Sequence, residues 1–258
     1  MQVHVLASGS SGNAIFIKKG STSVLIDAGI SAKRIKSGLA AVGSGIEDVD
    51  AVFLTHEHSD HVSGLTNLLK KHRLPIYATE GTWQALADKD KLPAECYRCL
   101  DAGLNIGAMK IEHFSILHDA AEPVGFNIFA GTTKCTVATD LGYVSESVKK
   151  ALANSDIMIL EANHDVDLLK DGSYPWFLKQ RILSNRGHLS NNDAGWTLAK
   201  LPRKDNMHVF LAHLSKENNN PQVAHQTISG ILSNEGITVG TEITLQLTFP
   251  DTIASFKS

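Results

Sequence analysis

The segment Thr55–His61, with the sequence THEHSDH, constrains this 258-residue chain more than any other stretch. It follows the four-residue apolar run Ala51–Leu54, which predicts a short buried strand. The next stretch, Val62–Lys71, carries apolar residues at helical spacing. A polar loop that happens to be rich in histidine is the alternative, but four potential ligands between a strand and a helix favour a metal site.

The ligand types and their spacing indicate which ions this segment could hold. Imidazole and carboxylate groups suit zinc, iron or manganese. His56 and His58 stand two residues apart on an extended segment, so their side chains point the same way. Asp60 and His61 stand at the start of the predicted helix and diverge from the first pair. The segment therefore predicts ligands for two ions.

The order of the other elements predicts the fold class. Strands are predicted at Val3–Leu6, Ala14–Ile17, Val24–Ile26, Ile76–Ala78, Met109–Phe114, Gly125–Phe129, Thr136–Ala138, Ile157–Leu160, Val209–Leu211 and Ile243–Phe249. Helices are predicted at Ser31–Val42, Gly81–Asp88, Ser145–Ala153, Trp176–Leu183, Asn191–Leu201 and Pro221–Leu232. This order predicts an α/β fold of two packed mixed sheets with helices on the outer faces. We expect one domain over residues 1–258, with two related halves at about 1–115 and 116–258.

Composition limits the partners and the compartment. The net charge of −3 gives no overall basic surface, so a nucleic-acid substrate would need a local patch or the metals themselves. No stretch of about 18 apolar residues predicts a transmembrane helix, so we expect no membrane partner. The odd count of three cysteines suggests a reducing cytoplasm. Cys96 and Cys99 form a CxxC without a second pair, which favours ordinary thiols over a zinc ribbon.

The HxHxDH pattern after an apolar strand resembles that of the metallo-β-lactamase superfamily, and further motifs of that family follow in order. They are Asp27 in LIDAG, His118 in LHD ahead of PVGF, Asp140 in ATDLG and His213 in LAHLS. The resemblance covers Val3 to about Pro221 and implies the αββα sandwich of that family.

The resemblance also implies a two-metal site. One divalent ion would bind His56, His58 and His118, and the other Asp60, His61 and His213. Asp140 would bridge the ions, with capping of the following helix as its alternative role. Zinc or manganese would occupy the site, with iron as a further option, and a bridging hydroxide would be the nucleophile. Asp60 would also take part in catalysis.

Two other roles follow from the same resemblance. Asp27 would support the metal loop from outside the ligand set, although alone it would be an ordinary turn residue. His188 in GHLSN resembles a histidine of the RNase Z-like branch that steadies the attacked phosphate and protonates the leaving oxygen. The alternative for His188 is a structural residue ahead of a helix capped by Ser190.

Substrate contacts are predicted at three places. Ser10, Ser11 and Asn13 lie in a small-residue loop that could cradle phosphate or simply form a turn. His164 follows a predicted strand end and would touch substrate or an outer metal shell, with a structural role as the alternative. The stretch between His164 and His188 contains aromatic and basic residues that could contact DNA or form an amphipathic helix: Tyr174, Trp176, Phe177, Lys179, Arg181 and Arg186.

Together these motifs resemble the YycJ (WalJ) branch of the superfamily. That resemblance implies a metal-dependent phosphodiesterase that digests DNA from 5′ to 3′, with DNA as substrate and repair proteins as partners. Two other hydrolases remain as alternatives: a phosphodiesterase for cyclic or nucleotide substrates, and a lactone or thioester hydrolase. A non-catalytic scaffold is disfavoured because every motif position holds a residue that can bind a metal.

Overall fold

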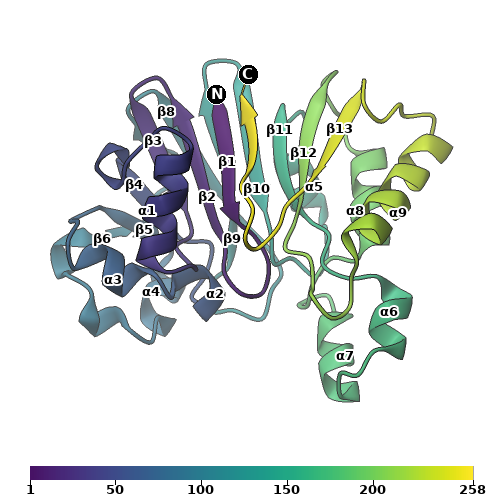
Figure 1. The fold of residues 1–258 in the computed structure, drawn as a ribbon, viewed down its shortest axis with the longest axis horizontal. Helices are drawn as coiled ribbons and strands as arrows, with labels where there is room; N and C mark the ends of the chain where they lie inside the picture. The colour runs from purple at the N-terminus through teal and green to yellow at the C-terminus, as the bar shows by residue number, and fades with distance from the viewer. Residues whose placement is uncertain (258) are drawn as a thin grey trace.

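The computed structural model describes residues 1–257, and its centre is a pair of seven-stranded sheets that face each other (Figure 1). The first sheet has the order β14-β1-β2-β3-β4-β5-β6. Its strands are β1 (Gln2–Ala7), β2 (Ala14–Lys19), β3 (Thr22–Ile26), β4 (Ala51–Phe53), β5 (Ile76–Ala78), β6 (Tyr97–Cys99) and β14 (Ala254–Lys257). Pairing is antiparallel from β14 to β3 and parallel from β3 to β6, so the sheet is mixed.

The second sheet has the order β13-β12-β11-β10-β9-β8-β7 and is also mixed. Its strands are β7 (Leu104–Ile106), β8 (Met109–Ser115), β9 (Val124–Ala130), β10 (Thr133–Ala138), β11 (Ile157–Glu161), β12 (Met207–Ala212) and β13 (Ile243–Leu247). β10 to β13 are parallel, and β11 and β12 are buried along their whole length. Strands covered on both faces need continuous apolar runs, which explains the sequences IMILE and MHVFLA.

Helices cover the outer face of each sheet. The first sheet carries α1 (Ala32–Ala41), α3 (Leu65–Leu69) and α4 (Glu80–Ala85), and the second carries α5 (Glu146–Leu152), α8 (Asn191–Lys200) and α9 (Pro221–Asn234). Three further helices are α2 (Ser59–Val62), α6 (Val166–Asp171) and α7 (Trp176–Ile182), and short 3₁₀ turns occur at Ile46–Asp48, Lys89–Lys91 and Ala94–Cys96. Among the residues described, none of these helices is long and apolar enough to cross a membrane.

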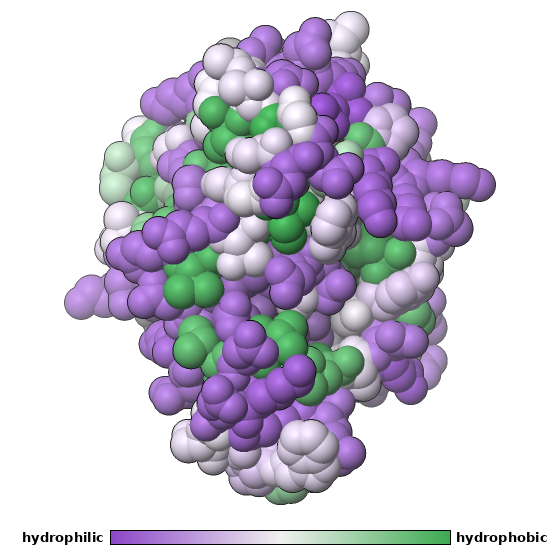
Figure 2. Space-filling view, turned by 90° about the vertical axis from the view of Figure 1, so that its right-hand side faces the viewer, coloured by the Kyte–Doolittle hydropathy of each residue, from purple (hydrophilic) through white to green (hydrophobic). Residues whose placement is uncertain are grey.

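The apolar core has three layers, as an αββα sandwich requires. Phe53, Phe126 and Phe210 are fully buried in the layer between the sheets. Separate buried clusters join each sheet to its own helices. On the side that carries α8 and α9, hydrophobic side chains form separate patches in a hydrophilic surface (Figure 2). The predicted fold class is confirmed.

The structure differs from the sequence prediction in its short elements. The helix predicted at Val62–Lys71 is shorter in the structure, because α2 ends at Val62 and α3 covers only Leu65–Leu69. β6, β7, β14 and α6 were not predicted; three of them have only three or four residues, too few to show a period.

The two sheets do not coincide with a division of the chain at position 115, and the two related halves expected there stay a prediction. β7 and β8 precede that position and belong to the second sheet, whereas β14 returns to pair with β1 in the first. The chain therefore leaves the first sheet after β6 and enters the second sheet at β7. Its description as a single domain stays a prediction.

Candidate metal centre

Asp27 holds the loop Thr55–His61, called here the HxHxDH loop, at the end of β3 and β4. Its Oδ1 accepts a hydrogen bond from the Thr55 backbone N–H at 2.8 Å. Its Oδ2 accepts hydrogen bonds from the Thr55 hydroxyl at 2.9 Å and from His61 Nδ1 at 2.7 Å. With Nδ1 so engaged, the Nε2 atom of His61 is left for a cation. The supporting role of Asp27 toward bound metal stays a prediction.

Three residues of the candidate site have a left-handed backbone. The φ angles are 61° at Asp27, 58° at Asp140 and 55° at His213. Non-glycine residues adopt such angles rarely, and the other two in the described part of the chain are asparagines, which tolerate them better. Each of the three follows the end of a strand, so each turns its side chain across the same edge of the sheets. Strain of this kind persists where surrounding contacts hold it, and functional sites are common examples.

The first group of potential ligands consists of His56, His58 and His118. One ligand atom from each lies within 4.8 Å of the other two. His118 Nδ1 is 3.1 Å from the carbonyl oxygen of Gly187, to which it can donate, so Nε2 remains for a cation. His56 Nε2 is buried and has no hydrogen-bond partner. An unpaired buried ring nitrogen is costly in an empty pocket, and a bound cation would satisfy it.

The second group consists of Asp60, His61 and His213, and it also lies within 4.8 Å. Asp140 lies between the groups: its Oδ2 is 3.2 Å from His61 Nε2, and its Oδ1 is 3.4 Å from His213 Nδ1 and 3.9 Å from His118 Nε2. This Oδ2 is buried without a hydrogen bond of good geometry. The structure thus brings together all seven residues predicted as ligands. Their donor set fits a divalent metal, and their ligand roles stay predictions.

The pKa shifts of the candidate ligands also favour a cation at this place. Burial lowers the pKa of His61, but the carboxylates of Asp140 and Asp27 outweigh it and raise that pKa well above its usual value. Burial raises the pKa of Asp140, but His213 and His61 outweigh it and hold that pKa well below its usual range. The pKa of His213 is raised as well, so His61 and His213 keep protons at the place where a cation would lie, whereas burial lowers the pKa values of His56 and His118. Because metal ligands must be deprotonated, a divalent cation would displace these protons.

Glu161 is the residue that the sequence did not indicate. It ends β11 and is completely buried. Its Oε1 accepts hydrogen bonds from His188 Nδ1 and His213 Nδ1, both at 2.8 Å. Its Oε2 accepts the backbone N–H groups of Leu141 and Leu189 at 2.9 and 3.0 Å. One carboxylate therefore fixes a potential ligand, the predicted acid His188 and the loops that carry Asp140 and His188.

His188 lies at the open side of the centre. Its side chain is 21% exposed, and its Nδ1 is 3.7 Å from Asp140 Oδ1. Burial lowers the pKa of His188, but Glu161 outweighs burial and raises it, which favours a ring able to donate a proton. His188 also lines a hollow of about 190 Å³ together with His213, Ser10 and Arg181. Asp140, Glu161, His188 and His213 form a further group that could hold a cation, and the non-ligand role of His188 stays a prediction.

The N-terminal loop supports the centre in a way that the sequence did not predict. Asn13 is buried; its Oδ1 accepts the Gly9 N–H at 2.9 Å, and its Nδ2 lies 3.3 Å from the Asp60 carbonyl oxygen and 3.1 Å from His61 Nε2. Asn13 therefore contacts the HxHxDH loop directly, and its predicted phosphate contact stays a prediction. Ser10 is exposed and lines the hollow beside His188, whereas Ser11 is exposed and does not line it.

Of the other residues predicted to contact substrate, some are buried and some are exposed. His164 is 1% exposed, and burial lowers its pKa to about 4, so a direct substrate contact is not supported. Lys179 is also buried, and its Nζ donates to the Lys170 carbonyl oxygen at 2.6 Å, which removes it from phosphate binding. Arg181 pairs with Asp119, the neighbour of His118. Trp176 and Phe177 are 64% and 72% exposed on α7 and remain available.

The two-sheet fold and the cluster of candidate ligands agree with a comparison against known protein families. A family model described as the β-lactamase superfamily domain matches residues 22–213. The chain belongs to this superfamily, as the HxHxDH resemblance predicted.

Within the superfamily, the chain is similar to proteins named as exodeoxyribonucleases. It is 39% identical over 253 residues to exodeoxyribonuclease WalJ of Streptococcus pneumoniae, covering 96% of this chain and 94% of the relative. It is 37% identical over 249 residues to exodeoxyribonuclease YycJ of Bacillus anthracis, covering 95% and 94%. Among solved structures, the metallo-β-lactamase fold protein YhfI of Bacillus subtilis matches with a TM-score of 0.75 and 18% identity, covering 98% of both chains.

Proposed function

We propose that this chain is a metal-dependent phosphodiesterase that digests DNA from the 5′ end. One observation carries the phosphodiesterase chemistry: His188, held by Glu161, stands beside the cluster of seven potential ligands without being needed in either ligand group. The DNA substrate is supported by the 37–39% identity, over nearly the whole chain, to the two exodeoxyribonucleases. The 5′-to-3′ polarity is part of the proposal.

The seven residues would hold two divalent ions, in the two groups with Asp140 between them. Zinc and manganese suit this set of imidazoles and carboxylates, and iron is compatible with it. When bound, such ions supply Lewis acidity to the phosphate oxygens and make a coordinated water more acidic.

The chain's own residues then position and move protons. Asp60 is the more exposed carboxylate of the centre, with 22% of its side chain accessible against 3% for Asp140, so it is placed to accept a proton from the attacking water. His188 would donate a proton to the leaving oxygen, and Glu161 would hold its ring toward the substrate. Ser10 and Ser215 line the same hollow and offer hydroxyl groups to a phosphate.

The proposal is tested by digestion of 5′- and 3′-labelled DNA, duplex and single-stranded, with manganese or zinc added. Loss of label from the 5′ end by the wild type, and none with Asp140→Ala, is the expected result. Cleavage of a small phosphodiester without any digestion of DNA would instead favour the small-substrate phosphodiesterase. Hydrolysis of a lactone or thioester but of no phosphodiester would overturn both proposals.

A cytoplasmic location and repair proteins as partners also belong to this proposal. The three cysteines are all free in the structure, which agrees with a reducing compartment.

A further inference from the structure

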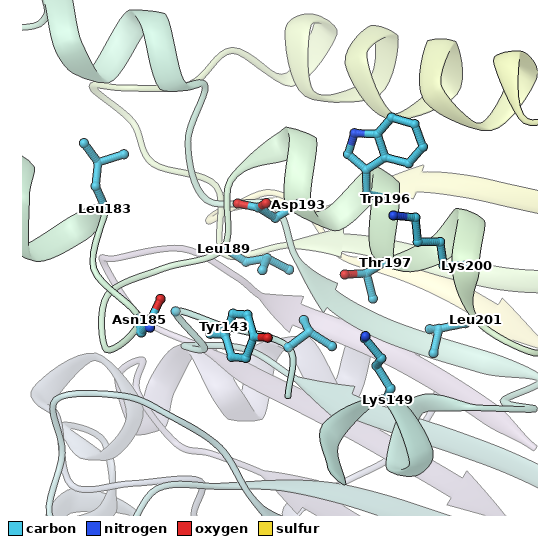
Figure 3. A pocket seen from close by; sticks show the side chains of 12 residues that line it. Tyr143, Lys149, Leu183, Asn185, Leu189, Asp193, Trp196, Thr197, Lys200 and Leu201 are labelled. Atoms are coloured by element: carbon cyan, nitrogen blue, oxygen red, sulfur yellow. The ribbon is translucent and has the colours of Figure 1, made fainter. Parts of the chain in front are cut away.

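A second hollow lies against the candidate metal centre, on the side of the second sheet. It encloses about 370 Å³ between α8 and the two loops that follow β10 and α7. Leu189, Thr197 and Leu201 contribute to its wall (Figure 3). None of its lining residues belongs to the two ligand groups, so it is a separate site.

The side chains around this hollow suit a nucleotide. Tyr143 and Lys149 lie on one side, and Trp196 and Lys200 lie on the other side, on α8 (Figure 3). Tyr143 and Trp196 are 50% and 42% exposed, so both rings are accessible to a ligand. Lys200 Nζ lies 5.0 Å from the centre of the Trp196 ring. Exposed aromatic rings beside lysines offer stacking to bases and charge to phosphates.

The hollow shares a wall with the metal centre. Gly142, at its inner end, is two residues from Asp140, and Leu189 is next to His188. The two loops pack tightly, because a Cβ at Gly142 would lie 2.5 Å from the Asn185 backbone. Both loops are also anchored on Glu161, through the N–H groups of Leu141 and Leu189. The wall of the hollow is thus built from the same two loops that carry Asp140 and His188.

The hollow continues outward as a groove between α5 and α8. A neighbouring hollow shares Lys149, Lys200 and Leu201 with it and adds Lys150. Two acidic residues face the same groove: Glu146, which pairs with Lys149, and Asp193, whose carboxylate accepts the Ser190 hydroxyl. The three lysines exceed the two acids by one charge, so the groove is locally cationic although the chain carries −3.

We propose that this groove holds the DNA strand next to the scissile phosphate, with a base stacked on Trp196 and Tyr143 and phosphates beside Lys149 and Lys200. The inference rests on the proposed function and deepens it, because it assigns a substrate-binding surface away from the metals. α8 has ten residues and is about 15 Å long. At about 3.4 Å per stacked nucleotide, it could follow about four nucleotides.

The test compares Trp196→Ala, Trp196→Phe and the double variant Lys149→Ala/Lys200→Ala with a control of equal charge change, Lys33→Ala/Lys70→Ala. Lys33 and Lys70 are exposed on the side of the first sheet. Two quantities are measured on the metal-loaded protein: the anisotropy of a fluorescein-labelled single-stranded oligonucleotide, and cleavage of both that oligonucleotide and bis(p-nitrophenyl) phosphate, which is too short to enter the groove.

Trp196→Ala should weaken oligonucleotide binding about 5- to 150-fold, because stacking on an aromatic ring carries that much affinity. Trp196→Phe should retain most of the affinity for the oligonucleotide, because it keeps an aromatic ring. The double lysine variant should lower the salt dependence of binding by about one to two units of slope. All variants should cleave bis(p-nitrophenyl) phosphate within about twofold of the wild type, and the Lys33→Ala/Lys70→Ala control should bind DNA like the wild type.

Failure of this inference and failure of the proposed function are distinguishable. Wild-type digestion of DNA with unchanged binding and cleavage in the Trp196 and lysine variants would overturn the groove and leave the exonuclease intact. Wild-type binding of DNA that the variants lose, without any digestion, would support the groove and overturn the exonuclease. Absence of both binding and digestion by the wild type would overturn both.

Discussion

The carboxylate of Glu161 contacts two histidines with different proposed tasks. His213 belongs to a ligand group, and His188 is the proposed acid; both donate from Nδ1 to the same Oε1. Such an outer carboxylate fixes the tautomer of a ligating histidine and makes its other nitrogen a stronger ligand. Loss of the Glu161 charge should therefore affect metal binding and catalysis together, whereas loss of the His188 ring should affect catalysis alone.

The variants Glu161→Gln and His188→Ala separate metal binding from catalysis. Glu161→Gln should weaken metal affinity about 10- to 100-fold, because the amide removes the charge that supports His213. His188→Ala should lower kcat about 10²- to 10⁴-fold, because it removes a proton donor. Metal content after dialysis and kcat on a DNA substrate are the two measurements. If His188→Ala also loses metal, then His188 is a ligand and the assignment of its role is wrong.

The sequence predicted residues that lie close together in the chain better than residues joined only by the fold. The spacing of the HxHxDH loop was enough to indicate a metal site. Glu161 was missed because its histidine partners are 27 and 52 residues away, and no spacing rule covers such distances. Asn13 was assigned to phosphate because its loop is rich in small residues, but its amide turns inward toward Asp60 and His61.

At the scale of elements, two glycines let the chain approach the HxHxDH loop closely. A Cβ at Gly29 would lie 1.6 Å from the Asp60 carbonyl oxygen, and one at Gly64 would lie 2.1 Å from that of Ile30. Gly64 also donates its N–H to the Ala28 carbonyl at 2.8 Å. This approach explains why the helix predicted at Val62–Lys71 begins only at Leu65, since periodicity alone does not report a backbone contact from another segment.

Gly29→Ala should therefore displace the segment of Asp60 and His61, weaken metal binding and destabilise the protein by about 1–3 kcal/mol through overpacking. Gly230→Ala is the matched control: Gly230 is exposed in α9, and a Cβ there would meet nothing within 4 Å. That control should be neutral or stabilise by up to about 1 kcal/mol, because alanine favours a helix. Urea unfolding and metal content measure both. Wild-type stability and metal binding in Gly29→Ala would contradict the close packing described here.

At the scale of the whole molecule, the candidate ligands come from both sheets. His56, His58, Asp60 and His61 follow β4 of the first sheet, whereas His118, Asp140 and His213 follow strands of the second (Figure 1). The sheet order was not predictable from the sequence, because β14 pairs with β1 across 251 residues at His4 and Ser255. The two-sheet architecture was predictable from the order of strands and helices along the chain.

Metal bound to these ligands would join the two sheets. Its removal should therefore lower the stability of the whole fold. A ligand present at 1,000 times its Kd stabilises the native state by about 4 kcal/mol. For a chain of this size, that corresponds to a rise in Tm of about 8–16 °C. The measurement is thermal unfolding of the protein treated with chelator, before and after zinc or manganese is added. His213→Ala, which removes a ligand from the second sheet only, should show a much smaller rise, and Lys33→Ala/Lys70→Ala should show the full rise. An unchanged Tm in a wild-type sample shown to have bound metal would mean that the ions do not connect the two sheets.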